Sequence, residues 1–435
     1  MTVCQQLDVI PDLLAVHALK PDTYPYLLAS NTRGNQNSRY SILMAHPQET
    51  CAQWGADDDC LQAIEIDPCQ RSSQALPFIG GWFVFLAYEY ARIIEPRVEY
   101  FDDDSGMPIA FRSRIPAAII VDHEKATACI VVEDGHAGLQ TEIAADLDGL
   151  AAYQPDDYAA GSIDEEDQRI YLGHIERTKR YIRDGDIYQA NLSRKWTVSY
   201  EDRCDPVALF HALSRSNPAQ FASLVKFDQC YVISSSPERL ISLRGGVAQS
   251  RPIAGTHPRG KTPGEDRELS AHLLAHPKEQ AEHVMLVDLV RNDLGRFCQA
   301  GSVNVTEQMV LESYEHVHHI VSNIQGRVEQ GRSIADIVHA VFPGGTITGC
   351  PKVRCMEIIS ELEQSARGAY TGSLGYIGHD GQLDLNILIR TLTYGGNSVS
   401  FRAGGGIVHD SVPERELMET RHKARGLLNA IKVHA

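Results

Sequence analysis

Residues 221–251, FASLVKFDQCYVISSSPERLISLRGGVAQSR, decide the fold class of this chain. They contain three apolar runs, FASLVKF, CYVISSS and LISL, separated only by short polar segments. Runs of this length and composition predict β-strands, and the Gly245-Gly246 pair predicts a tight hairpin turn. Consecutive strands with no helix between them indicate antiparallel hairpins in a mixed α/β protein rather than repeated βαβ units.

Helices and further strands flank this stretch on both sides. Residues 189–198 alternate, so that Ala190 and Leu192 share one face of a predicted strand while Gln189 and Asn191 share the other. Before residue 160, short apolar segments predict sheet with few helices. Apolar spacing, first-turn prolines and a glycine at one helix end predict helices over 167–184, 205–217, 277–297, 351–363 and 413–431.

One stretch interrupts this pattern. Residues 144–168 are rich in Asp, Ala and Gly and have no apolar periodicity, which predicts a linker or a long surface loop. We therefore place a boundary near residue 160, between an N-terminal region, 1–160, and a second region, 161–435.

The composition is that of a large folded protein with 435 residues, of which 43% are hydrophobic. The 40 lysines and arginines are outnumbered by 57 acidic residues, which gives a formal net charge of −17. This charge repels polyanions and argues against nucleic acid or an anionic membrane as a partner. The ten cysteines form no C-x-x-C pair, and no signal peptide or membrane-length apolar run is present, so we expect reduced thiols in a cytoplasmic protein.

One motif points to a different class of protein. Residues 255–262, GTHPRGKT, satisfy the pattern of a nucleotide-binding P-loop, and VMLVD at 284–288 resembles the acidic strand that would hold its magnesium. A P-loop requires Lys261 and Thr262 to begin a helix, however, and Pro263 disfavours the helical conformation at Thr262. VMLVD also lies in a segment with helical spacing. A P-loop nucleoside triphosphatase is therefore kept only as a remote alternative.

Two pairs of glutamates lie three residues apart on predicted helices: Glu279 with Glu282, and Glu416 with Glu419, which is followed by Lys423. This spacing places both carboxylates of a pair on one helical face. Two such faces opposed to each other would form an oxygen-only site suited to Mg²⁺. A solvated helix face has the same spacing, so the pairs alone leave both interpretations open.

Two glycine-rich segments, PGGTITGCPK at 343–352 and AGGGIV at 403–408, predict loops. Their backbone N–H groups could converge on an anion, or the segments could be tight turns. Arg390 and Tyr370 stand in strand-like contexts. A buried arginine needs a partner, which could be a structural glutamate or the carboxylate of a ligand.

Two further residues could transfer protons. His319, next to His318, could act as an acid or a base near neutral pH, although an isolated histidine is more often structural. Glu238 follows a predicted strand and Pro237, a position from which a carboxylate can be aimed into a cleft or can lie on a surface turn.

Taken in order, these motifs resemble those of the chorismate-utilising enzymes over nearly the whole chain. The resemblance is carried by IYQANLSR, SSSPERL, RPIAGTHPRGKT, EHVMLVDLVRNDLGR, HHIVS, FPGGTITGCPKVRCMEII, GSLGYIGHDGQLDLNILIRTL and AGGGIVHDSVPERELMETRHKA. RPIAGTHPRGKT is one of the family's segments, which argues against a P-loop. The family implies an α+β fold like that of anthranilate synthase component I, with two large, mainly antiparallel sheets packed as a sandwich and helices outside. Residues 1–160 then resemble its N-terminal segment, and 161–435 its chorismate-binding catalytic region.

The resemblance also implies roles for the candidate residues. Glu282 and Glu419 match the family's Mg²⁺ ligands, with Glu279 and Glu416 in support. The matching substrate-binding positions are Gly255, Thr256, Tyr370, Arg390, Gly404, Gly405, Gly406 and Lys423. The positions matching groups at the reacting carbons are Glu238, a proposed acid/base, His319 and Thr346 at the departing C4 hydroxyl, and Ala254, where some members have a lysine.

Members of the family differ in their nucleophile. Those that use water carry an activating lysine where this chain has Gln189, and an amide cannot serve as that base. The resemblance therefore implies ammonia. It also implies a separate glutamine amidotransferase subunit, since the chain lacks the nucleophilic cysteine motif of such a domain.

Two ammonia-using branches remain. Asn191, Asn217-Pro218-Ala219, HHIVS and FPGGTITG resemble the aminodeoxychorismate synthases, amino-transferring enzymes of the transaminase class that serve p-aminobenzoate and folate biosynthesis. The PIAGT segment with Ala254 instead resembles the anthranilate synthases of tryptophan biosynthesis, since the first branch commonly has a lysine there that adds to C2. The sequence favours the first branch and keeps the second as its alternative. A binding-only protein of the same fold is a third class.

The segment LLAS at 27–30 resembles part of an amino-acid pocket of the family. Leu28 and Ser30 could contribute to a tryptophan site, either a feedback site or a structural one.

Overall fold

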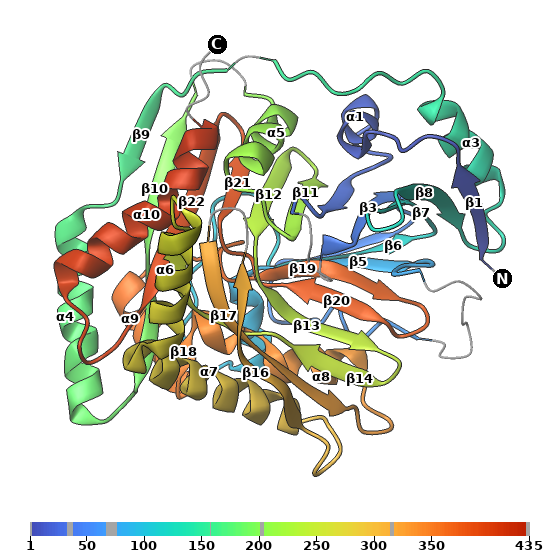
Figure 1. Cartoon of the computed structure of the whole chain (residues 1–435). Helices are drawn as coiled ribbons and strands as arrows, with labels where there is room; N and C mark the ends of the chain where they lie inside the picture. Colours follow the sequence, from blue (N-terminus) through green and yellow to red (C-terminus); the bar gives the residue numbers. More distant parts are fainter. Residues whose placement is uncertain are drawn as a thin grey trace.

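Two large sheets form the centre of the molecule, and every strand pair in them is antiparallel (Figure 1). The computed structural model describes residues 2–32, 38–66, 76–156, 158–200, 204–313 and 317–431, with the backbone alone at 254, 256–258, 277, 278 and 317. One sheet, called sheet A, has 12 strands in this part of the chain, and the other, sheet B, has 10. The predicted sandwich of two antiparallel sheets is confirmed.

Sheet A runs from the N-terminal strand to the strands that carry most of the site. Its order is β1 (Val3–Leu7), β8 (Thr127–Val132), β7 (Ala117–Asp122), β3 (Tyr40–Ala45), β2 (Tyr26–Ala29), β11 (Phe221–Phe227), β12 (Cys230–Ser236), β21 (Thr391–Gly395), β22 (Ser398–Ile407), β10 (Gln189–Ser199) and β18 (Gly349–Cys350), with β9 (Ser162–Glu165) also on β10. Sheet B has the order β15 (Ile253–Pro258), β17 (Val317–Arg327), β14 (Val247–Ser250), β13 (Arg239–Arg244), β20 (Leu383–Asn386), β19 (Ser373–Gly378), β5 (Gly81–Leu86), β6 (Ala110–Ile115) and β4 (Thr50–Gln53), with β16 (Asn304–Ser313) also on β17.

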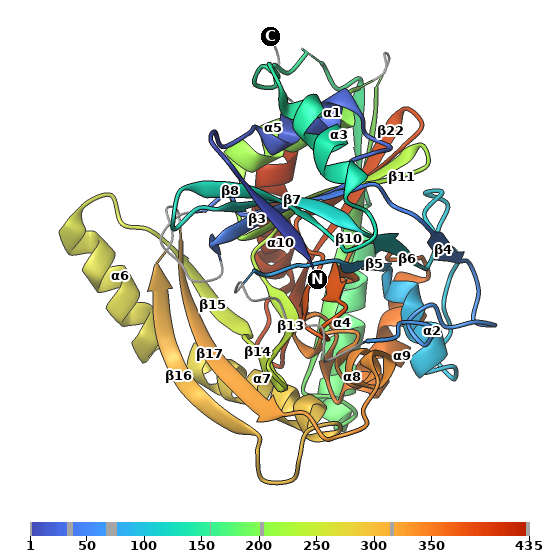
Figure 2. The same cartoon turned by 90° about the vertical axis from the view of Figure 1, so that its right-hand side faces the viewer.

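Helices cover the outer faces of both sheets (Figure 2). Those on sheet A are α1 (Leu13–Leu19), α3 (Gly138–Leu147), α5 (Pro206–Ser216) and α10 (Pro413–Ile431). Those on or beside sheet B are α6 (Pro263–Ala275), α7 (Pro277–Gly295) and α8 (Ile334–Val341). The helices packed on β10 are α4 (Gln168–Asp184) and α9 (Lys352–Glu363), and the short helices are α2 (Ala91–Ile94), η2 (Tyr88–Tyr90) and η3 (Gly345–Ile347).

Local chemistry explains why the predicted helices form where they do. Asp205 caps α5 by accepting a hydrogen bond from the Val207 N–H, and Pro206 occupies the first turn, where no N–H is needed. Gly185 ends α4 in the left-handed conformation, with φ of 85°. The helices predicted over 277–297, 351–363 and 413–431 are confirmed as α7, α9 and α10.

The core lies in layers between these elements. Apolar side chains between the two sheets include Met44, Phe83, Phe85, Phe111, Ile120 and Val232. Those between sheet A and its helices include Val16, Leu43, Leu213, Leu224 and Leu427, and those between sheet B and its helices include Val84, Ile241, Val290, Leu294 and Val338. Both sheets take strands from either side of residue 160, so the two sequence regions share their cores.

Two local predictions are wrong, and the P-loop alternative, which the sequence argued against, is excluded. AGGGIV is no loop, because residues 403–407 are part of β22 and pair with β10. Arg390 lies just before β21 with φ of 52°, and Tyr370 lies in the turn before β19, so neither is in a strand. GTHPRGKT is no phosphate-binding loop, because its first half is β15 and Thr262 is extended, at φ −127° and ψ 155°, as the N-cap of α6. VMLVD lies within α7, so the P-loop alternative is excluded.

In the described residues, the helices are too short or too polar to cross a membrane. The described cysteines are free thiols, and Cys69 lies outside the described residues.

Candidate active site

Glu238 is aimed into the fold from the connection between β12 and β13. Its side chain is buried, and its backbone carbonyl accepts a hydrogen bond from the Ile387 N–H at 3.0 Å. Burial raises the pKa of Glu238 to about 7, although the nearby Thr346 hydroxyl, the Ile253 N–H and the charge of Lys423 each act to lower it. A carboxyl group with this pKa is partly protonated at neutral pH, so Glu238 can donate a proton. The surface-turn interpretation of Glu238 is excluded.

His319 has the opposite character. It lies in β17, across from Thr256 of β15, and is 3% exposed. Burial lowers the pKa of His319 to about 4, and the charge of Arg390 adds to this effect. The imidazole is therefore neutral at neutral pH, where it can donate or accept a hydrogen bond but holds no extra proton to give. The backbone of Ala254 and Thr256 lies in β15 beside it, while their side chains lie outside what the structure describes.

Arg390 is a half-buried cation whose side-chain partner is a neutral amide. Burial lowers its pKa. Its Nη1 donates to Asn217 Oδ1 at 3.3 Å, and among the described residues it makes no ion pair with an acidic side chain. A guanidinium held this way, beside neutral His319, is suited to the carboxylate of a ligand.

The glycine strand borders the same region. β22 pairs with β21 only as far as Phe401 with Leu392, whereas its pairing with β10 continues to Ile407. Residues 403–407 therefore have one edge that β21 does not cover, and this edge begins close to Arg390. A Cβ at Gly404 would lie 2.3 Å from Leu192 O and 2.8 Å from the Tyr370 hydroxyl, so only glycine lets the buried Tyr370 approach the strand.

Acidic side chains of α10 gather next to Gly405. A Cβ at Gly405 would lie 3.5 Å from Glu419 Oε1, 3.7 Å from Lys423 Nζ and 3.8 Å from Glu416 Oε2. Lys423 Nζ lies 2.7 Å from Glu419 Oε1 and also donates to Gly404 O at 2.9 Å. The structure thus brings Glu416, Glu419 and Lys423 to the glycine strand, as the sequence predicts.

The second pair of predicted metal ligands lies on α7. A Cβ at Gly255 would lie 2.9 Å from Glu279 Oε2, and Gly255 is also a backbone partner of His319. Glu282 is half-buried one helical turn further on. These donors are all carboxylates, which fits Mg²⁺, although no three acidic, histidine or cysteine side chains of the described residues converge closely enough to form a complete cluster. Their role as ligands stays a prediction.

Two buried amide oxygens face this region from β10. Gln189 and Asn191 are 2% and 9% exposed. Gln189 Oε1 and Asn191 Oδ1 have no hydrogen-bond partner within the described part of the chain. The Gln189 side chain lies against Gly406, where a Cβ would be 2.5 Å from Nε2. The two side chains therefore offer unused acceptors for N–H groups.

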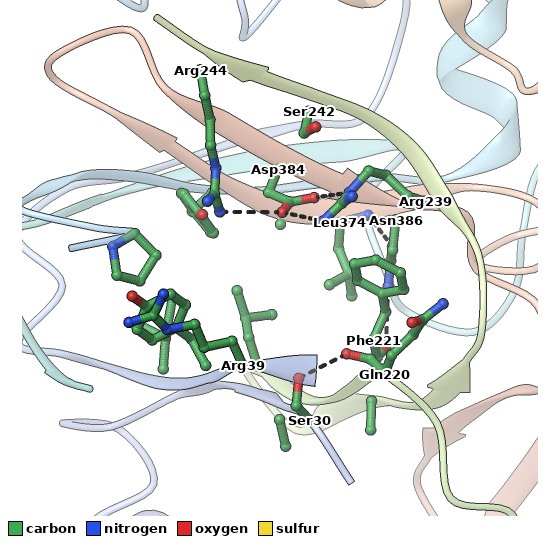
Figure 3. A pocket seen from close by; sticks show the side chains of 18 of the residues that line it. Ser30, Arg39, Gln220, Phe221, Arg239, Ser242, Arg244, Leu374, Asp384 and Asn386 are labelled. Carbon is green, nitrogen blue, oxygen red and sulfur yellow. Dashed lines mark hydrogen bonds and ion pairs between the residues drawn. The ribbon is translucent and has the colours of Figure 1, made fainter. Parts of the chain in front are cut away.

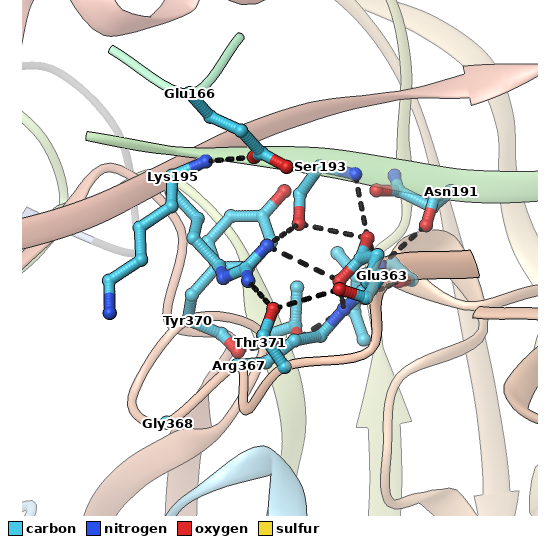
Figure 4. Close-up of polar contacts among 12 residues, drawn as sticks. Glu166, Asn191, Ser193, Lys195, Glu363, Arg367, Gly368, Tyr370 and Thr371 are labelled. Carbon is cyan, nitrogen blue, oxygen red and sulfur yellow. Dashed lines mark hydrogen bonds and ion pairs between the residues drawn. The ribbon is translucent and has the colours of Figure 1, made fainter. Parts of the chain in front are cut away.

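A buried ion network supports the site, and the sequence analysis did not find it (Figure 4). Glu363 accepts hydrogen bonds from the Ser193 N–H at 2.8 Å and from Arg367 at 2.6 and 2.9 Å. Arg367 also donates to the backbone oxygens of Asn191 and Ile347. Only the spacing of four between Glu363 and Arg367 could have signalled it.

A separate pocket of about 390 Å³ includes Leu28 and Ser30, both predicted to lie in an amino-acid site (Figure 3). Ser30 Oγ donates to Gln220 O at 3.0 Å, and Arg239 forms an ion pair with Asp384 at 2.7 Å on one wall of the pocket. The further charged residues that line it are Arg39 and Arg244. The pocket combines apolar walls with charges of both signs.

Comparison with known proteins shows the family of the chain. A family model described as chorismate binding enzyme matches residues 24–429. The chain is 42% identical over 404 residues to an anthranilate synthase component I-like protein of Synechocystis sp., covering 91% of this chain and 83% of that protein. It is 39% identical over 367 residues to aminodeoxychorismate synthase component 1 of Bacillus subtilis, covering 82% and 78%. The structure of anthranilate synthase component I from Streptococcus pneumoniae matches with a TM-score of 0.80 at 30% identity, covering 91% of this chain and 93% of that one.

Proposed function

The chain belongs to the chorismate binding enzyme family, and we propose that it is the large component of an aminodeoxychorismate synthase, which replaces the C4 hydroxyl of chorismate by an amino group. The nitrogen would come as ammonia from a separate glutamine amidotransferase subunit. The product, 4-amino-4-deoxychorismate, would lead to p-aminobenzoate.

The choice of ammonia rather than water as the nucleophile rests on Gln189. At the position where water-using relatives have a basic lysine, this chain buries an amide whose oxygen has no partner among the described residues. An amide oxygen cannot remove a proton from water, but it can accept a hydrogen bond from ammonia, and Asn191 Oδ1 offers a second acceptor on the same face of β10.

The remaining residues suit a dianionic substrate. Arg390 and Tyr370 would bind the carboxylate of the enolpyruvyl group, and Lys423 with the open edge of Gly404–Gly406 would bind the ring carboxylate. Glu282 and Glu419, supported by Glu279 and Glu416, would hold a Mg²⁺ ion, which supplies positive charge to the ring carboxylate when bound.

Glu238 and His319 would have different roles at C4. As the C4–oxygen bond breaks, Glu238 would give its proton to the departing hydroxyl, which leaves as water. Ammonia would form the new C–N bond, and the nitrogen would then lose one proton. His319, neutral at neutral pH, and Thr346 would orient the departing group by hydrogen bonds.

The alternative is an anthranilate synthase component, and Ala254 in PIAGT favours it. In that reaction ammonia attacks C2 and pyruvate is eliminated. The test is to incubate the purified chain with chorismate, Mg²⁺ and an ammonium salt, and to identify the product by mass and fluorescence with and without added aminodeoxychorismate lyase. p-Aminobenzoate formed only with the lyase would support the proposal, whereas fluorescent anthranilate formed without it would support the alternative.

We also propose that the pocket at Leu28 and Ser30 binds an amino acid, with tryptophan as the first candidate. Its volume of about 390 Å³ and its charged lining suit an apolar side chain with an ammonium and a carboxylate group: Asp384, paired with Arg239, could bind the ammonium, and Arg39, paired with Asp122, could bind the carboxylate. Stabilisation of the chain by L-tryptophan but not D-tryptophan in a thermal unfolding series would support this. No stabilisation by either enantiomer would contradict it.

A further inference from the structure

Asn217 is the side-chain partner of Arg390 in the described part of the chain, and several contacts fix its position. It directly follows α5, where its N–H donates to Leu213 O at 2.9 Å. Its carbonyl oxygen accepts a hydrogen bond from the Ser235 hydroxyl. A Cβ at Gly426 of α10 would lie only 3.1 Å from Asn217 Cβ, so this helix packs closely on the side chain. Asn217 therefore has little freedom to move.

The two ends of the Asn217 amide have different partners. Oδ1 accepts a hydrogen bond from Arg390 Nη1 at 3.3 Å, whereas Nδ2 donates to Ser235 O at 3.4 Å. The N–H of Ser235 also donates to Arg390 O at 3.1 Å, which ties the backbone of Arg390 to β12. A guanidinium can only donate and a carbonyl can only accept, so these neighbours fix the orientation of the amide, with its oxygen towards the guanidinium.

The most buried arginines of the fold have a different kind of partner. Arg194, Arg367 and Arg402 have side chains that are at most 6% exposed, and each lies within 3.4 Å of a glutamate oxygen. The protein itself thus compensates the charge of these structural arginines. At Arg390 the partner has the shape of an aspartate but no charge, and no acidic side chain of the described residues forms an ion pair with it.

The positive charge of Arg390 acts within the candidate site. It helps to lower the pKa of His319, which burial already lowers. A ligand carboxylate placed here would meet a fixed guanidinium that the protein has not neutralised. Such a guanidinium binds a carboxylate more strongly than one already in an ion pair, because in an ion pair the ligand has to compete with a carboxylate of the protein.

We propose that Asn217 is a positioning residue that holds the Arg390 guanidinium in place without neutralising it, so that the carboxylate of the substrate becomes its ionic partner. Asn217 acts through Arg390 and supplies no charge of its own. This role rests on the proposed function, in which Arg390 binds the enolpyruvyl carboxylate of chorismate. An amide at residue 217 then raises the affinity for the substrate, whereas a carboxylate would stabilise the empty protein instead.

Asn217→Asp tests the proposal because it keeps the shape of the side chain and adds a charge. It replaces a neutral hydrogen bond to Arg390 by an ion pair and gives up only the long contact to Ser235 O. The dissociation constant of chorismate, measured by calorimetry with Mg²⁺ and without ammonia, should rise at least roughly tenfold, while kcat changes by less than about threefold. The unfolding temperature of the ligand-free protein should stay the same or rise.

Either of two results for Asn217→Asp would overturn the proposal. The first is a dissociation constant equal to that of the wild type. The second is an unfolding temperature lower by more than about 2 °C, since the weaker binding would then reflect a damaged fold.

Asn217→Ala separates the holding of Arg390 from the charge at residue 217. It removes the hydrogen bond and adds no charge, so the dissociation constant of chorismate should rise by only roughly two- to fivefold. If Asn217 mattered through its hydrogen bond alone, the aspartate variant, which keeps that bond, would bind chorismate better than the alanine variant. This reverse order would overturn the proposal.

A double-mutant cycle with Arg390→Met controls for the added charge itself. In the Arg390→Met background, Asn217→Asp should change the dissociation constant by less than about threefold, because the guanidinium through which residue 217 acts is gone. A further loss of roughly tenfold in that background would mean that the new carboxylate repels the dianionic substrate directly, and would overturn the proposal.

These measurements are separate from the test of the proposed function. A chain that binds chorismate but forms anthranilate, or no product, would contradict the proposed function. The dissociation constants of the variants would still decide the role of Asn217, and the unfolding temperatures need no substrate at all.

Discussion

The guanidinium of Arg367 lies 2.6 Å from a carboxylate oxygen of Glu363, and the two side chains are 1% and 3% exposed. Burial alone would raise the pKa of Glu363, but the charges of Arg367 and Arg402 hold it below its ordinary value. The same guanidinium reaches the backbone of β10 at Asn191 and of η3 at Ile347. The pair therefore joins three segments that carry site residues, namely β10, the segment with Thr346 and the turn with Tyr370.

We predict that Glu363→Gln destabilises the fold by about 3–5 kcal/mol, because it leaves two buried guanidinium groups without their shared carboxylate. The free energy of unfolding in denaturant measures this. Glu361→Gln is the control, since Glu361 is two positions away, 41% exposed and paired with Arg177, and it should cost less than about 1 kcal/mol.

Replacing Arg390 should weaken substrate binding without lowering the stability of the fold. In Arg390→Met the KM for chorismate should rise roughly 10- to 100-fold, the equivalent of about 1.5–3 kcal/mol for hydrogen bonds to a charged group. Stability should stay the same or increase, because the variant removes a cation that has only Asn217 as a side-chain partner among the described residues. Steady-state kinetics and thermal unfolding check the two effects. Arg402→Met, which removes a partner of Glu363, should instead lower the unfolding temperature.

Local elements could be predicted from the sequence, but contacts between distant segments could not. Helices such as α4 and α5 follow from local caps, so the pattern of residues near Gly185 and Asp205 predicts them. The coupling of Glu363 to Arg402 depends on β22 lying beside β10, which no local pattern encodes. The glycines of 404–406 suggested a loop, but their function in the fold is to leave room on a paired strand, where Gly404 approaches Leu192 O and Gly405 faces Glu419.

The pKa of Glu238 gives a prediction with a definite sign. It is raised from 4.5 to about 7, so the folded state binds this proton more tightly than the unfolded state. The protonated Glu238 carboxyl therefore stabilises the fold at low pH by about 3 kcal/mol, and this stabilisation is lost as pH rises through about 7. The free energy of unfolding of Glu238→Gln minus that of the wild type should therefore rise by about this much from roughly pH 5 to pH 8. A constant difference between the two proteins would contradict the assignment.

The same group should shape the pH profile of turnover. With free ammonia held constant, kcat of the wild type should fall as pH rises above about 7, because Glu238 ionises. Glu238→Gln should lower kcat by roughly 10²–10⁴-fold and leave chorismate binding nearly intact. Kinetics over a pH series, with chorismate affinity measured by calorimetry, separate the two effects.

Glu419 provides a test of the metal prediction. Glu419→Gln should raise the Mg²⁺ concentration needed for half-maximal turnover by roughly 10- to 100-fold. Glu414→Gln changes an exposed carboxylate at the start of the same helix and should leave the Mg²⁺ dependence unchanged. Identical Mg²⁺ titrations for both variants would remove Glu419 from the set of ligands.

A substitution at Ala254 tests whether amination at C4 requires a covalent adduct at C2. The resemblance to the aminodeoxychorismate synthases implies a lysine at this position that adds to C2, whereas this chain has Ala254, and alanine has no nucleophile. If ammonia reaches C4 without this step, Ala254→Lys should allow a covalent adduct with chorismate, seen by mass spectrometry of the intact protein, while turnover of the unmodified chain shows that the adduct is not required. The backbone of residue 254 pairs with Ile320 in β17, next to His319, so a lysine there starts from the same strand pair as the candidate site. A lysine variant that forms no adduct would count against placing this chain in the aminodeoxychorismate branch.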